Sequence, residues 1–381
     1  KRYKPVLVFR GSISMSNKTG FVYHELFAWH DTGNWSLFLP PGFPIQPGMH
    51  VEHPETKRRF KNLLDASGFI NELKPVEPIA ATDEDILRFH TEKYFNTVKK
   101  MSDENGGDVG QLTQVGLGSF EIAKLSAGGV IEATKAVMAG DIDNAYVLAR
   151  PPGHHADADQ GIGFCVFGNI VIAIKHAIAN LGVRRVAVVD WDVHHGNGTE
   201  TAFYDDPNVL TISAHQDNWF PPNRGFVSDI GSGDGEGFAI NIPLPPGSGM
   251  GAYESAFDRI VSPALDGFKP DIIFVASGFD GSAFDPLGRM MMHSKGYATL
   301  TKKLMAAADR LCNGRLVMAH EGGYSPTYVP FCGLAVLEAL SGKSSGVDDP
   351  FLEFAQGMAG QDLQQHQEEL IAIVEKQISH R

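Results

Sequence analysis

The stretch Val186-Ala-Val-Val-Asp-Trp-Asp-Val-His-His-Gly-Asn-Gly198 joins a short apolar run to a loop rich in carboxylates and imidazoles. The apolar run is typical of a buried strand in a parallel sheet. A second stretch has the same design, because Ala145-Tyr-Val-Leu-Ala149 leads into Arg150-Pro-Pro-Gly-His-His-Ala156. Open α/β sheets place ligands and catalytic groups just beyond the carboxyl ends of their strands. Both histidine pairs are therefore predicted to lie at neighbouring strand ends.

Strand and helix patterns alternate along most of the chain. Strands are predicted at 145–149, 186–190, 209–214, 238–242, 271–277 and 315–319. Helices are predicted at 55–66, 82–88, 91–101, 121–139, 166–181, 252–267, 295–312, 331–341 and 362–379. This alternation predicts a mostly parallel sheet with helices on both faces.

The opening segment is less regular than the rest. Residues 1–60 are rich in Gly, Pro and aromatic residues, and we expect long loops around one strand at Val6–Phe9. No internal repeat and no linker composition stands out, so the whole chain, residues 1–381, is predicted to form a single domain.

Composition restricts the class of protein. A net charge of −13 argues against a nucleic-acid surface, because phosphate binding needs clustered Lys and Arg. The charge suits cationic partners, although many proteins are simply acidic. The three cysteines, Cys165, Cys312 and Cys332, contain no short-spaced pair, so a disulfide framework is not expected and the compartment is reducing. The sequence shows no signal-peptide pattern and no membrane span, and we expect a cytoplasmic protein without a membrane partner.

Carboxylates and an imidazole collect at two of the predicted strand ends. Asp192 and His194 are two residues apart, so in an extended segment their side chains project to the same side. The strand at 271–277 leads into Ser277-Gly-Phe-Asp280, which adds a second carboxylate. Three protein ligands with an open position are typical of catalytic zinc, although Fe(II) or Co(II) could compete for two carboxylates and one histidine. An isolated Asp-x-His pair more often caps a helix, and the two features below favour the metal.

The first of these features is the pair His154 and His155. Adjacent buried imidazoles need hydrogen-bond partners, and Asp190 and Asn197 are available in the predicted metal loop. We predict that His154 pairs with Asp190 and His155 with Asn197, and we count all four as catalytic. A carboxylate partner favours the charged imidazole, whereas an amide does not. His155 would then be neutral and accept a proton from water, while His154 stabilises developing negative charge.

The second feature is Glu321-Gly-Gly-Tyr324, which follows the apolar run at 316–319. Two glycines allow a sharp turn that could place the Tyr324 phenol near the metal, where its hydroxyl would donate a hydrogen bond to an oxyanion. The tetrapeptide alone is equally typical of a tight turn beside a packing aromatic.

These segments together resemble the zinc-dependent histone deacetylase family, specifically its class II branch and the bacterial deacetylase-like amidohydrolases. The resemblance runs from about Pro54 to Leu340, and Asn197 stands where class I members carry Asp. Besides the motifs above, it rests on Gly163-Phe-Cys165 and Asp285-Pro-Leu-Gly288. The segment Phe21-Val-Tyr-His-Glu-Leu-Phe-Ala-Trp-His30 is similar to the bacterial members. The resemblance implies an arginase/deacetylase fold with an eight-stranded, mainly parallel sheet.

The resemblance also implies a set of site residues. The zinc ligands would be Asp192, His194 and Asp280, with His154 and His155 as the histidine pair and Tyr324 as the oxyanion donor. The acyl-lysine channel would be walled by Phe164 and Phe220, with Gly163 and Gly323 beside them. A structural potassium ion would lie near Asp190, Asp192, His194, Ser213 and Ala214. An acidic substrate-positioning residue would lie somewhere in 102–110.

The implied reaction is hydrolysis of an acetylated ε-amine, as in an acetyl-lysine peptide or protein. The alternative is an acetylpolyamine amidohydrolase, since such enzymes share every motif. They often narrow the channel with an acidic loop, and the acidic stretch Asp103–Asp108 is short. An inactive partner-binding protein would be expected to lose Tyr324, a ligand or the histidine pair. An arginase-like binuclear site is not expected, because Gly196 and Ser282 stand where its extra aspartates would be.

The aromatic opening segment could serve assembly. Tryptophans in loops are suited to anchoring a protein interface, and Trp29 and Trp35 could do so, although they could equally pack on the domain's own core. We expect a homo-oligomer, with a tetramer as one candidate state.

Overall fold

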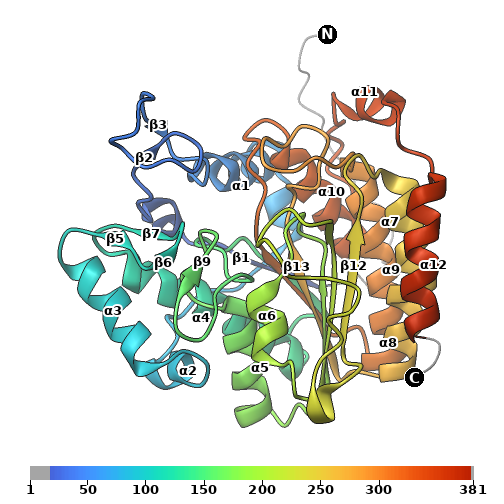
Figure 1. The fold of residues 1–381 in the computed structure, drawn as a ribbon, viewed down its shortest axis with the longest axis horizontal. Helices are drawn as coiled ribbons and strands as arrows, with labels where there is room; N and C mark the ends of the chain where they lie inside the picture. Colours follow the sequence, from blue (N-terminus) through green and yellow to red (C-terminus); the bar gives the residue numbers. More distant parts are fainter. Residues whose placement is uncertain (1–17, 379–381) are drawn as a thin grey trace.

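The computed structural model describes residues 18–378, and its centre is a sheet of eight strands. The strand order is β12-β11-β10-β13-β14-β8-β1-β4, and every neighbouring pair is parallel (Figure 1). The strands are β1 (Thr19–Val22), β4 (Lys74–Pro75), β8 (Asn144–Val147), β10 (Val186–Asp190), β11 (Val209–Gln216), β12 (Ala239–Leu244), β13 (Ile272–Ser277) and β14 (Leu316–His320). The sheet predicted from the alternating pattern is confirmed, and it is parallel throughout.

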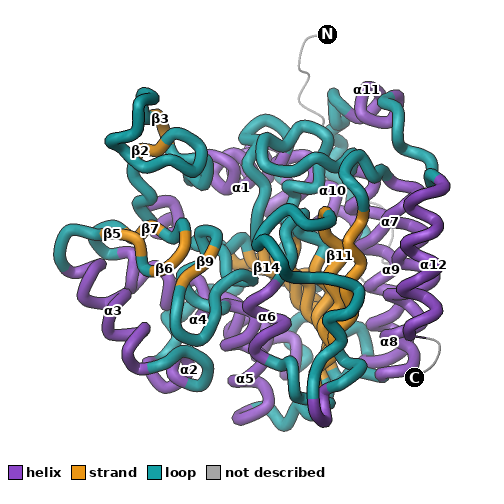
Figure 2. The backbone as a smooth tube through the Cα atoms, in the orientation of Figure 1, coloured by secondary structure: helices purple, strands orange, loops and turns teal. Residues whose placement is uncertain are grey.

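Helices cover both faces of this sheet (Figure 2). The helices are α1 (Glu55–Ser67), α2 (Asp83–Leu87), α3 (Glu92–Asp103), α4 (Ser119–Ala139), α5 (Asn169–Asn180), α6 (Asn197–Ala202), α7 (Met250–Ala256), α8 (Ser262–Phe268), α9 (Ser294–Cys312), α10 (Val329–Ser341), α11 (Leu352–Gly357) and α12 (Gln365–Ile378). A π-helical turn, Phe257–Val261, joins α7 to α8, so the predicted helix at 252–267 is continuous but locally widened. Pro263 follows this turn and has no N–H to donate, which is consistent with the change in hydrogen bonding.

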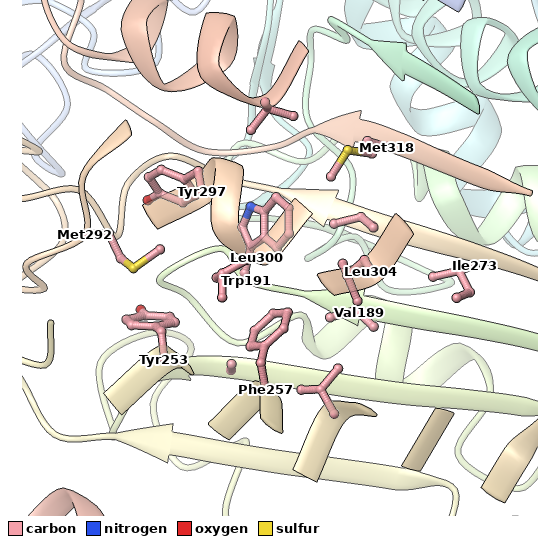
Figure 3. Close-up of a cluster of buried hydrophobic side chains, with 14 of the residues drawn as sticks. Val189, Trp191, Tyr253, Phe257, Ile273, Met292, Tyr297, Leu300, Leu304 and Met318 are labelled. Carbon is pink, nitrogen blue, oxygen red and sulfur yellow. The ribbon is translucent and has the colours of Figure 1, made fainter. Parts of the chain in front are cut away.

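Alternating side chains of each strand enter two separate cores. Along β10, Ala187 and Val189 belong to one apolar cluster, whereas Val186 and Val188 belong to the other. In the first cluster the indole of Trp191 packs close to Phe257 and Tyr297 (Figure 3). Because both faces of the strand are buried, its sequence is a continuous apolar run and not an alternating one.

The N-terminal part of the described chain departs from the expected loops. β1 is an inner strand of the sheet, between β8 and β4, and neither β1 nor β4 was predicted. Both are short, so neither has enough residues to show a periodic pattern. The predicted strand Val6–Phe9 lies outside the described residues.

A small antiparallel pair stands out from the body of the molecule (Figure 1). It is formed by β2 (Asn34–Trp35) and β3 (Gly48–Met49), after a 3-10 turn, η1 (Glu25–Trp29). Trp35 is buried, with its ring centroid 5.5 Å from that of His50, whereas Trp29 is 69% exposed. The two tryptophans proposed as assembly anchors therefore differ, since only Trp29 is free to contact a partner.

A buried ion pair connects this N-terminal segment to the loop that follows β8. Arg150 Nε donates to Glu52 Oε1 at 2.9 Å, and Arg150 Nη1 donates to the carbonyls of Phe27 and His30 at 2.9 and 2.7 Å. Lys57 also approaches Glu52, at 3.3 Å. Arg150, at the start of the histidine motif, thus holds the N-terminal segment against the loop that follows β8. Within residues 18–378, no helix combines the length and the apolar character needed to span a membrane.

Candidate active site

Three potential metal ligands converge where β10 and its neighbour β13 end. Asp192 and His194 follow β10, and Asp280 follows β13. His194 Nδ1 lies 3.1 Å from Asp192 Oδ1 and 3.1 Å from Asp280 Oδ2. Backbone N–H groups hold the remaining carboxylate oxygens, since Val193 donates to Asp280 Oδ1 and Gly322 to Asp192 Oδ2, both at 2.8 Å. The ligands predicted from two separate motifs therefore meet at one buried point.

The charges at this point favour a bound cation. Burial alone would lower the pKa of His194, but its hydrogen bonds to Asp192 and Asp280 raise that pKa to about 10. Burial and the nearby charge of Asp192 raise the pKa of Asp280 to about 6. The two buried carboxylates thus stabilise a positive charge between them, here on the His194 imidazole. Two oxygens and one nitrogen with open positions match the donor set of a catalytic divalent metal, so the residues present fit zinc.

The histidine pair has the hydrogen-bond partners that were predicted. His154 Nδ1 lies 2.9 Å from Asp190 Oδ2, and His155 Nδ1 lies 2.8 Å from Asn197 Oδ1. Burial opposes charge on His154, yet the carboxylates of Asp192 and Asp190 raise its pKa to about 10. Burial and the charge of neighbouring His154 hold the pKa of His155 well below its usual range. Two adjacent and chemically identical side chains are therefore set in opposite charge states.

Two acidic residues hold the backbone at the predicted catalytic groups, and neither role was predicted. Glu321 Oε2 accepts the N–H groups of Gly153 and His154 at 2.6 and 3.1 Å. Asp285 Oδ2 accepts the Tyr324 N–H at 2.7 Å. Glu321 and Asp285 each belong to a motif quoted above. A hydrogen bond from a distant backbone N–H to a carboxylate has no sequence pattern, so these roles could not be predicted.

An apolar cavity of about 260 Å³ leads to these groups. It is lined by Phe38, Leu112, His155, Gly163, Phe164, His194, Trp219, Phe220, Leu287 and Tyr324. Gly163, Phe164 and Phe220, which were predicted to lie in the channel, are among these residues. Gly323 is not among these residues, and a Cβ at that position would meet Phe279 and Val329.

Four of the lining residues were missed by the sequence reasoning. Phe38, Leu112 and Trp219 lie in loops outside the quoted motifs, and Leu287 lies within the motif Asp285-Pro-Leu-Gly288 but was given no role. The indole Nε1 of Trp219 donates to the Leu287 carbonyl at 2.7 Å, which joins two sides of the entrance. No acidic side chain in residues 18–378 lines this cavity.

The predicted potassium ligands lie at and just after the end of β10 and within β11, where Asp190 pairs in register with Ser213. Asp190 Oδ1 accepts the Asp192 N–H at 3.0 Å, and the Ser213 hydroxyl lies 2.9 Å from His215 Nδ1. In the loop expected to carry the substrate-positioning acid, Asp108 Oδ1 accepts N–H groups from Gly110 and Thr113. Its loop leads directly to Leu112 of the cavity.

A larger cavity of about 830 Å³ lies elsewhere, among the starts of β11 and β12 and the helices α8 and α12. Its lining is mainly apolar, and Arg259 within it is already paired with Glu368 and Glu375. It brings together no acid–base pair or ligand set among the described residues, so the smaller cavity is the candidate active site.

Residues 50–340 match the family model described as the histone deacetylase domain. The chain is 52% identical over 343 residues to a histone deacetylase-like amidohydrolase of Pseudomonas aeruginosa, covering 89% of this chain and 90% of the relative. It is 36% identical over 330 residues to a probable deacetylase of Archaeoglobus fulgidus, covering 85% and 86%. A crystal structure of the HDA15 HD domain superposes with a TM-score of 0.79 at 29% identity, covering 96% of this chain and 100% of the other.

Proposed function

This chain belongs to the histone deacetylase family, and we propose that it is a zinc-dependent amidohydrolase that removes acetyl groups from acylated ε-amines of lysine. One observation carries the proposal. A convergent O,N,O ligand set, a neutral histidine and a charged histidine all lie together where an apolar cavity ends. Such a combination suits a hydrolysis that needs an activated water, a proton acceptor and a proton donor.

Asp192, His194 and Asp280 would hold the zinc ion. When bound, zinc supplies Lewis acidity, which polarises the acyl carbonyl and lowers the pKa of a water toward about 7. His155, neutral at ordinary pH, accepts the proton of the attacking water. The Tyr324 hydroxyl donates a hydrogen bond to the developing oxyanion, and burial keeps the phenol protonated by raising its pKa. A proton is then returned to the departing amine by the charged His154, which Asp190 keeps in place.

The cavity lining supports an acyl-lysine as the substrate. Phe164 and Phe220 form apolar walls suited to the methylene stem of lysine. A polyamine would bring a second ammonium group close to the same walls, and no carboxylate of the described chain lines the cavity to receive it. We therefore place a peptidyl acetyl-lysine ahead of an acetylpolyamine.

Three further expectations accompany this function. Asn197 supports assignment to class II. The carboxylates and carbonyls near Asp190 and Ser213 suit a structural potassium ion. Exposed apolar side chains of the N-terminal segment favour a homo-oligomer, and we take residues 1–381 as one domain.

The proposed function is tested with zinc-loaded protein on an acetyl-lysine peptide and on N-acetylputrescine, side by side. We expect a higher kcat/KM for the peptide. Tyr324→Phe should lower kcat by about 10²–10³ with little change in KM, because the lost hydrogen bond forms only in the transition state. A preference for N-acetylputrescine would move the enzyme to polyamine hydrolysis. Turnover of neither substrate with zinc bound would contradict the deacetylase assignment.

A further inference from the structure

A second group of potential metal ligands includes His154 of the histidine pair. His154, Cys165 and Glu321 each offer one ligand atom, and these atoms lie within 4.8 Å of one another. All three residues are buried. They come from three separate segments: the loop after β8, the Gly-Phe-Cys turn, and the end of β14. The O,N,O set described above contains none of them.

The cluster contains an unsatisfied buried oxygen. Glu321 Oε2 is bonded to two backbone N–H groups, whereas Glu321 Oε1 is buried and has no hydrogen-bond partner among the described residues. Glu321 itself is fully buried. An unpaired carboxylate oxygen in such a position costs free energy unless a proton, a water or a cation satisfies it.

The histidine of this cluster has one ring nitrogen left for a cation. Asp190 bonds His154 Nδ1, so the cation would bind Nε2, which lies 3.8 Å from Asp192 Oδ1. A carboxylate on the far side of a ligating imidazole is the usual support of a metal-bound histidine. Tetrahedral zinc with bonds of about 2.0–2.3 Å brings its donor atoms to roughly 3.5 Å from one another. Small rotations of the three side chains would therefore complete the site.

We propose that His154, Cys165 and Glu321 form a second, inhibitory site for a thiolate-seeking divalent cation such as Zn²⁺ or Cd²⁺. Binding replaces the thiol proton of Cys165, the Nε2 proton of His154 and any proton on Glu321 by the cation, and all of these protons pass to solvent. The His154 Nε2 lone pair binds the cation, so this imidazole no longer carries a proton to give to the departing amine. Thiolate and imidazole select soft or borderline cations, so Mg²⁺ should not compete.

Inhibition rests on the function proposed above, but occupancy of the site does not. With His154 engaged, excess Zn²⁺ should lower kcat by about 10², the usual contribution of one acid–base group. The loss should reverse when excess metal is dialysed away and one zinc per chain remains.

The site is tested with zinc-loaded protein to which Co²⁺ is added in excess. Only a thiolate ligand produces a sulfur-to-cobalt charge-transfer band in the near ultraviolet, and the O,N,O site contains no sulfur. We expect this band in the wild type and in the matched controls Cys312→Ser and Cys332→Ser, whose thiols are also buried. It should be absent from Cys165→Ser and Cys165→Ala, which should retain activity with one zinc and resist excess Zn²⁺.

The absence of the band from the wild type would overturn the proposal, as would a band of equal strength in both Cys165 variants. Using two substitutions separates loss of the ligand from misfolding, which circular dichroism would also reveal. If no protein hydrolyses the acetyl-lysine peptide, the deacetylase function fails, and the cobalt spectrum still decides whether the second site exists.

Discussion

At the scale of single residues, neighbouring side chains of one type are made chemically different by what each one contacts. His154 and His155 are adjacent and equally buried, yet one bonds a carboxylate and the other an amide. The pKa of His154 is raised to about 10 and that of His155 is lowered well below its usual range. The choice between Asp and Asn at one position can therefore decide which histidine accepts a proton.

Asn197→Asp tests this directly. A carboxylate beside His155 favours its charged form, so the pKa of His155 should rise. Since only neutral His155 can accept the water proton, the acid limb of the kcat/KM profile should move to higher pH. The measurement is kcat/KM against pH, with Asn180→Asp as a control that adds the same charge on the surface. An unchanged acid limb would contradict the assignment of His155 as proton acceptor.

Gly322→Ala tests the ligand set without changing any ligand, because the added methyl group would push against the carboxylates of Asp192 and Asp280. A Cβ at Gly322 would lie 2.0 Å from Asp280 Oδ2 and 2.7 Å from Asp192 Oδ2, so both carboxylates would have to move. We expect zinc affinity to fall by about 10–100-fold, as for other changes that displace supporting contacts of a ligand. Competition with a chelator measures the affinity. The matched control is Gly267→Ala, where no atom lies within 4 Å of the new Cβ, and equal affinities would exclude this ligand set.

At the scale of elements, the candidate site depends on how loops are held at the ends of the parallel strands. Arg150 is buried between the N-terminal segment and the histidine loop, and it bonds both Glu52 and backbone carbonyls. Arg150→Met would leave Glu52 buried with only Lys57 beside it. We expect a loss of about 3–5 kcal/mol in the free energy of unfolding, measured by denaturant titration.

Two further variants are compared with Arg150→Met, to separate the effect of the buried ion pair from that of an exposed one. Arg310→Met breaks a solvent-exposed pair with Asp266 and should cost less than about 1 kcal/mol. The double variant Arg150→Met/Glu52→Gln also leaves Lys57 buried without its carboxylate partner, so it should lose more stability than Arg150→Met alone. If Arg150→Met costs no more than Arg310→Met, the buried pair does not hold the segment in place.

The elements themselves were predictable where they are long or apolar. The observed β10 matches the predicted 186–190, and α9 lies within one residue of the predicted 295–312. β1 and β4 were missed because four and two residues carry too little periodicity, and their strand state comes from pairing with neighbours. α6 was missed because it begins within the motif itself, at Asn197.

At the scale of the whole molecule, the N-terminal segment presents an unusual amount of apolar surface. Its exposed large apolar residues are Leu26, Trp29, Leu37, Phe38, Leu39, Phe43, Ile45 and Met49. Clustered exposed apolar groups usually mark a protein interface. This observation favours the predicted homo-oligomer, and we expect its contact on residues 26–49, the segment that includes the small antiparallel pair (Figure 1).

Replacing Trp29 and Met49 together by Ser should weaken this assembly. Light scattering should show a lower mass at equal concentration, because the two most exposed apolar side chains of the segment are gone, while zinc content stays unchanged. The control is Phe354→Ser/Ile373→Ser, which removes exposed apolar groups from α11 and α12. A wild-type mass equal to that of one chain would contradict the oligomer.

The sequence by itself determined the parallel sheet, the strand ends that carry chemistry, and the residues able to bind metal or protons. These features are local, because the apolar run of a buried strand and the spacing of Asp192 and His194 can each be recognised within a few consecutive residues. Only the tertiary structure decided that Trp219 and Phe38 complete the cavity, and that Glu321 and Asp285 hold the backbone of the loops beside it. Such contacts join segments far apart in the chain. They depend on the order of strands in the sheet and on loop packing, which no short stretch of sequence encodes.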